Sequence, residues 1–110
     1  MENNNNDKGY VDAAEILDNT ANFVTNNWDK VILVSERNTE DGGKEMAFRT
    51  SEDGRRKLTE SVREVRDEED RRLVSVNETA DGFRLTVGGT FLKHPRYGKT
   101  VWEVVDNIIN

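Results

Sequence analysis

The segment 93–100 holds the densest group of residues that could do chemistry. Its basic, aromatic and hydroxyl side chains are Lys93, His94, Arg96, Tyr97, Lys99 and Thr100. The segment leads into a predicted helix, and the free N–H groups and dipole of a helix N-terminus attract anions. We therefore treat it as a candidate site for a phosphate, an acidic side chain or a nucleic-acid backbone. The alternative interpretation is a solvent-exposed loop whose basic residues offset the acidic first half of the chain.

No catalytic or metal-binding pattern is complete in this chain. Gly98-Lys99-Thr100 resembles the end of a phosphate-binding P-loop, but Lys93 stands where that loop needs its first glycine. His94 is the single histidine, and the sequence assigns it no nucleophile or orienting partner. The acidic run 67–70 lacks the glycine and alternating ligands of a calcium loop. There is no cysteine for a thiolate zinc site or a nucleophile. We therefore predict a protein that is not an enzyme and has no cofactor and no metal site.

A second candidate site lies on the helix predicted from residue 100 onward, where Thr100 and Glu103 fit a capping box. The apolar stripe of this helix consists of Val101, Val104, Val105 and Ile108. Trp102 and Ile109 lie off that stripe. Tryptophan is enriched among the residues that anchor protein interfaces, so this pair is a candidate contact for a protein partner or a second copy of the chain. The alternative is that Trp102 wraps around the helix edge into the core.

Composition and charge limit the class of protein. The 110 residues suffice for one domain, and 22 acidic against 16 basic side chains give a formal net charge of −6. This balance excludes a generally basic nucleic-acid binder, and no apolar run is long enough to span a membrane. The lack of cysteine and of a basic, then apolar, leader predicts a cytoplasmic protein.

Hydrophobic periodicity and turn residues predict the order of the elements. The Asn-rich start has no apolar anchor, so residues 1–9 are predicted to be a disordered tail before a single domain over 10–110. In chain order, the predicted elements are a helix over 11–26, a hairpin of strands 31–34 and 45–50, a helix over about 52–68, a hairpin of strands 73–77 and 83–87, and the last helix.

The element order helix–hairpin–helix–hairpin–helix predicts an α+β fold. Its sheet has four mostly antiparallel strands, with the helices packed on one face. The predicted core consists of Ile16, Leu17, Val24, Ile32, Val34, Phe48, Leu58, Val62, Val74, Leu85, Val87 and Val105. A shift of 40 residues aligns six of the ten positions 33–42 with 73–82. Two hypotheses explain this: two hairpins with convergent composition, or a duplicated helix–strand–strand unit.

Two functional hypotheses follow. The first is a small, acidic, non-catalytic protein-interaction module, such as an adaptor, a chaperone-like protein or an inhibitor of a protein partner, with a homodimer among its expected states. In architecture it resembles the small acidic dimeric chaperones of secretion systems, and in size and acidity phage-encoded inhibitors of host enzymes. The second hypothesis is binding of nucleic acid or another anion through the basic loop 93–100.

Overall fold

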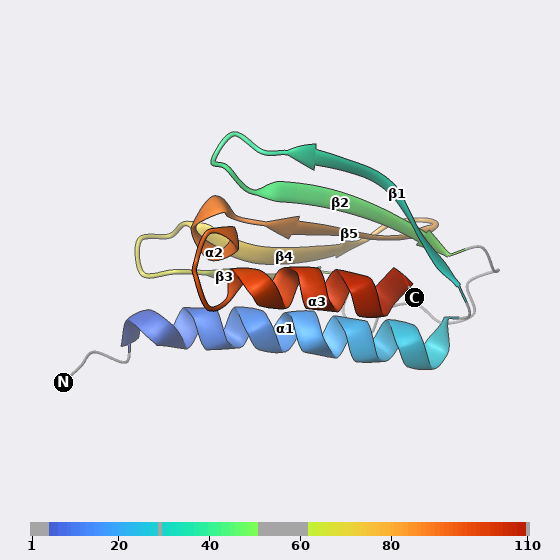
Figure 1. Cartoon of the computed structure of the whole chain (residues 1–110), viewed down its shortest axis with the longest axis horizontal. Coiled ribbons are helices and arrows are strands. Elements are labelled where there is room, and N and C mark those ends of the chain that lie inside the picture. The colour runs from blue at the N-terminus through green and yellow to red at the C-terminus, as the bar shows by residue number, and fades with distance from the viewer. Residues whose placement is uncertain (1–4, 29, 51–61, 110) are drawn as a thin grey trace.

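The computed structural model describes residues 5–28, 30–50 and 62–109. In chain order its elements are α1 (Asn5–Asn27), β1 (Val31–Asn38), β2 (Lys44–Thr50), β3 (Val62–Arg66), β4 (Arg72–Glu78), β5 (Gly82–Val87), the short α2 (Gly89–Leu92) and α3 (Gly98–Ile109). The predicted α+β class is confirmed: helices pack against an antiparallel sheet (Figure 1). No helix in the described ranges combines the length and apolar character that a membrane crossing needs.

The sheet has five strands in the order β1-β2-β5-β4-β3, whereas the sequence predicted four. In the central pair, Met46 lies opposite Leu85 and Phe48 opposite Phe83, and all four side chains are almost fully buried. They form the covered face of the sheet, along which α1 and α3 lie side by side (Figure 1). Because successive strand residues point to opposite faces, the residues between them, such as Arg84, form an open face.

The predicted second helix over 52–68 is wrong where the structure describes it. Residues 62–66 form β3, which pairs with β4, and residues 52–61 lie outside the described residues. Valines three apart fit a helical stripe, but β-branched side chains favour strands when a sheet edge offers hydrogen-bond partners. Arg66 and Asp70 meet across the hairpin turn, with Arg66 Nη1 3.8 Å from the Asp70 carboxylate.

Helix α1 begins at Asn5, not near residue 11 as predicted. A Cβ on Gly9 would lie 3.3 Å from the Arg66 carbonyl oxygen, and the Tyr10 ring stacks on Phe91 with centroids 5.8 Å apart. These contacts with distant segments give the early helix a packing surface that the local pattern does not contain. The predicted disordered tail over 1–9 overlaps this helix. Because residues 1–4 lie outside the described part of the chain, the tail itself stays a prediction.

Two predicted core residues are on the surface. Ile32 and Val34 are 40% and 51% exposed, because β1 is an edge strand rather than a central one. A register shift between Leu33 and Ser35 adds a bulge at Val34. Ile16 is half-buried, and the side chains of Leu58 and Val62 lie outside the described part. The other predicted core residues are buried: Leu17, Val24, Phe48, Val74, Leu85, Val87 and Val105.

The two segments that resemble each other in sequence form matching hairpins, β1–β2 and β4–β5. In each turn a threonine hydroxyl accepts a hydrogen bond from a glycine N–H: Thr39 from Gly43 at 3.0 Å, and Thr79 from Gly82 at 3.1 Å. Met46 and Leu85 stand three residues after these glycines and lie opposite each other in the β2–β5 pair. An approximate two-fold axis between them therefore relates the hairpins. The helix–strand–strand duplication does not hold, because β4 follows a strand and β1 follows a helix.

Candidate functional site

His94 has a structural role in the loop that joins α2 to α3. Its Nδ1 accepts hydrogen bonds from the backbone N–H groups of Arg96 at 3.0 Å and Tyr97 at 3.3 Å. Its ring packs between Tyr10 and Tyr97, with centroids 5.0 and 4.9 Å away. Nδ1 can accept these two hydrogen bonds only when it carries no proton, and by accepting them it stabilises the conformation of the loop.

The start of α3 is already largely hydrogen-bonded. The helix begins at Gly98, so Thr100 is its third residue and not its cap as predicted. The N–H of Gly98 donates to the His94 carbonyl at 2.9 Å, and that of Thr100 to the Tyr97 carbonyl at 3.1 Å. Tyr97 is buried, and the Arg96 guanidinium lies 5.2 Å from its ring centroid. Few directed donors and no open aromatic face are therefore left for an anion.

The basic side chains of this loop face solvent. Lys93, Arg96 and Lys99 are all exposed. Lys93 lies over the β1–β2 turn, because a Cβ on Gly42 would come 2.8 Å from its Nζ. The loop thus brings His94 and Tyr97 together as packing residues and leaves its three basic side chains exposed.

Sequence reasoning missed Asp41, which joins the β1–β2 turn to the start of α2. Its carboxylate accepts hydrogen bonds from the Thr39 hydroxyl, from the Gly43 N–H at 3.1 Å and from the Gly89 N–H at 3.3 Å. The Thr39 bond, more than the backbone bonds, holds the pKa of this carboxyl below its ordinary value and outweighs partial burial. A Cβ on Gly89 would lie 2.0 Å from the Asp41 carbonyl oxygen, so the two backbones touch here. In the sequence, Asp41-Gly42-Gly43 and Gly88-Gly89 were the signals that could have indicated this close contact.

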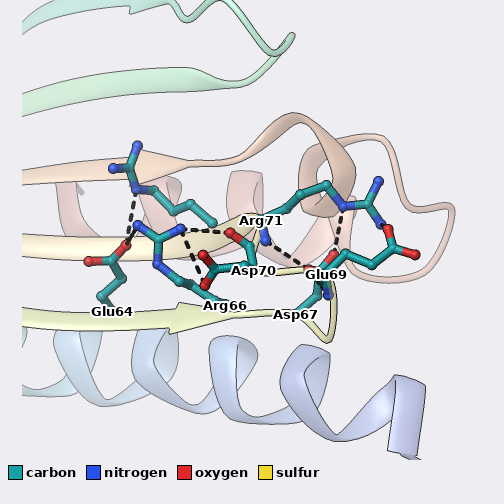
Figure 2. Close-up of polar contacts among 7 residues, drawn as sticks. Glu64, Arg66, Asp67, Glu69, Asp70 and Arg71 are labelled. Atoms are coloured by element: carbon teal, nitrogen blue, oxygen red, sulfur yellow. Dashed lines mark hydrogen bonds and ion pairs between the residues drawn. The ribbon is translucent and has the colours of Figure 1, made fainter.

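Asp67 organises the β3–β4 turn, at the end of the segment that the sequence predicted to be a helix over about 52–68. Burial raises the pKa of its carboxyl, but hydrogen bonds from the N–H groups of Arg71 and Glu69 and from the Arg71 guanidinium outweigh this effect, so the pKa is lowered. Asp70 takes a left-handed conformation with φ 65° to close the turn. Figure 2 shows the acidic and basic side chains of this turn paired with one another.

Most of the exposed apolar side chains belong to two neighbouring elements, and they do not all share a face: Ile32 lies opposite Arg49 and points to the open face of the sheet. The large hydrophobic residues that are exposed in the described ranges are Val11, Ile32, Val34, Trp102 and Ile109. Four of these five belong to β1 and α3, which contact each other. Ile109 and Val31 also line one pocket of about 320 Å³, whose other walls come from the ends of α1 and α3. The structure therefore leaves Trp102 and Ile109 accessible, with 43% and 40% of their surfaces exposed.

Within the described ranges, no three histidine, cysteine, aspartate or glutamate side chains are grouped so that they could hold a metal ion. The chain matches no protein-family model, no curated protein and no solved structure. The arrangement of its own residues is therefore the basis for assigning a function.

Proposed function

We propose that this chain is a non-catalytic protein-interaction module whose partner docks on edge strand β1 and the adjoining exposed side of α3. The observation that carries the proposal is the concentration of exposed apolar residues on these two elements. Exposed apolar residues on a monomer are usually scattered singly, and a concentration of them is typical of a protein-binding surface.

The edge strand gives this surface a way to bind backbone as well as side chains. Among the described strands, β1 pairs only with β2, and its other side presents N–H and C=O groups along the strand. An extended segment of a partner can add to such an edge, while apolar pockets read its side chains. Trp102 then has the size and position of an interface anchor.

Site-specific photo-crosslinking in the source cells tests the proposal. We expect a photoreactive residue at position 34 or at position 109 to capture the same protein, which mass spectrometry identifies. Position 11 is the matched control, because Val11 is as exposed as Val34 but lies on α1. Self-capture would identify a second copy as the partner, and sedimentation would then measure the dimer.

Substitutions provide the second arm of the test. Trp102→Ala should weaken binding by about 2 kcal/mol or more, as truncation of interface anchors does. Val34→Lys should also weaken it, whereas Val11→Lys should not. Capture that is equal at positions 11, 34 and 109, or absent from all three, would contradict the proposal.

A further inference from the structure

The open face of the sheet carries arginines that the protein's overall charge does not predict. The register places Arg37 opposite Glu45, and Ala47 opposite both Ser35 on β1 and Arg84 on β5. Arg49 follows Ala47 by two residues on the same strand and therefore points to the same face. Opposite and diagonal neighbours in a sheet lie about 5 to 8 Å apart. We call Arg37, Arg49 and Arg84 the arginine triad; each is an opposite, diagonal or next-but-one neighbour of Ala47 in the sheet.

One carboxylate lies within the triad and only partly neutralises it. Glu45 contacts Arg37 Nε at 2.5 Å and Arg84 Nε at 3.6 Å. Arg49 forms no ion pair with a described residue and is exposed. The triad with Glu45 therefore carries +2, whereas the whole chain carries −6, which leaves −8 on the remaining residues. A set of ion pairs that served only to stabilise the sheet would need no such local excess.

The arginines at the other end of the open face are different. Arg66 and Arg72 share Glu64, at 2.9 and 3.4 Å, and Arg66 also lies near Asp70 (Figure 2). Glu64 on β3 and Asp70 in the β3–β4 turn thus neutralise this end. Positive charge on the open face is therefore confined to the side formed by β1, β2 and β5.

Small polar side chains next to the triad add hydrogen-bonding groups. Ser35 and Thr86 flank it, and Asn77 lies opposite Arg84 on β4. The Asn77 Oδ1 is buried and has no hydrogen-bond partner; as an acceptor, it does not contribute to phosphate binding. Arginine, serine, threonine and asparagine are the side chains that most often contact the phosphates and sugars of nucleic acids. Guanidinium groups match phosphate oxygens in geometry as well as in charge.

We infer that the arginine triad binds the phosphate groups of a single nucleic-acid strand lying across the open face of β1, β2 and β5. The described residues of this face include no aromatic side chain for stacking bases, so recognition is of the backbone and independent of base sequence. The acidic remainder of the protein confines the contact to a few phosphates. This surface shares strand β1 with the proposed docking surface, where Ile32 lies opposite Arg49. Neither proposal rests on the other, so either can fail alone.

The test is fluorescence anisotropy with a fluorescein-labelled 12-nucleotide oligothymidine, titrated with the whole chain at several salt concentrations. Neutralising three phosphates predicts a slope of log K against log salt of about −2 for a single strand. Replacing Arg37, Arg49 and Arg84 together by glutamine should weaken binding at least tenfold and bring the slope near zero. Circular dichroism checks that this variant is folded.

Two matched variants keep the test decisive even if the triple variant unfolds. Glu45→Gln removes the carboxylate and should tighten binding several-fold. Arg96→Gln with Lys99→Gln, in the 93–100 loop, should leave binding unchanged. The inference is overturned if Glu45→Gln does not tighten binding, or if the loop variant loses as much affinity as the triad variant. Equal affinity for polyglutamate would also overturn it, because the surface would then fit an acidic polypeptide.

Discussion

Replacing Asp41 by alanine removes a carboxylate that accepts hydrogen bonds from Thr39, Gly43 and Gly89. A hydrogen bond to a charged group contributes about 1.5 to 3 kcal/mol, and an ordinary one about 0.5 to 1.5. Asp41 is exposed, and its backbone bonds are 3.1 and 3.3 Å long, so each of the three bonds contributes roughly 0.5 to 0.7 kcal/mol, the lower end of the ordinary range. We therefore expect Asp41→Ala to reduce the free energy of unfolding by about 2 kcal/mol, which for a domain of this size lowers Tm by about 8 °C.

The matched control is Asp81→Ala, in the equivalent turn of the second hairpin. There the hydroxyl of Thr79 accepts the glycine N–H, and no hydrogen bond to the Asp81 side chain occurs among the described residues. Urea unfolding at pH 7 should therefore show a large loss for Asp41→Ala and a loss below about 0.5 kcal/mol for Asp81→Ala. Equal losses in the two variants would refute the role given to the Asp41 carboxylate.

The pH dependence of the Asp41 effect has a definite sign. The folded state lowers the pKa of Asp41 below its ordinary value of 3.8, so the stabilisation is complete above that value. It is lost as the pH falls through the lower, folded pKa. The difference in stability between the wild type and Asp41→Ala should therefore be constant from pH 7 to pH 5 and shrink below about pH 3.8.

Three further outcomes follow from the geometry. His94→Ala should lower the free energy of unfolding by about 1 kcal/mol, while His94→Asn, whose side-chain oxygen can replace Nδ1, should recover part of this loss; thermal melts of both variants check it. Asp67→Asn should destabilise the protein at pH 7 and have little effect at pH values below the lowered pKa of Asp67, because the wild type has then also lost its charge; urea unfolding at the two pH values would contradict this if the loss stayed constant. Trp102→Phe should remove most of the acrylamide-quenchable tryptophan fluorescence, because Trp102 is 43% exposed and Trp28 only 8%; strong quenching that persists in the variant would show that Trp28 is accessible.

Patterns of apolar residues predicted correctly the elements that bury one regular face. The three- and four-residue spacing of Leu17, Ala21 and Val24 gave α1, and the alternation of Phe83, Leu85 and Val87 gave β5, because each pattern reports one buried face. The pattern failed at β3, where valines three apart fit either a helix or a strand. Residues 62–66 form a strand because they pair with β4, which comes later in the chain, and the local pattern carries no information about that pairing.

The candidate site was predicted less well than the fold. Trp102 and Ile109 were correctly placed off the buried stripe, because position on a helix follows from spacing alone. In the 93–100 loop, the sequence showed the charges but not the hydrogen bonds through which His94 and the backbone satisfy one another. The arginine triad was invisible because its members come from three strands whose register depends on the whole sheet.

The approximate two-fold axis between the hairpins predicts how a strand added beside β1 would be oriented. The axis relates β1 to β4, and β4 has an outer neighbour, β3, which runs antiparallel to it. The corresponding position beside β1 is unfilled among the described strands. A strand supplied by a partner would complete a six-stranded array in which both outer strands run antiparallel to their neighbours. β1 has a bulge at Val34, and β4 has a bulge where it faces Arg66 of β3. The added strand would therefore pair with a bulged strand, as β3 does.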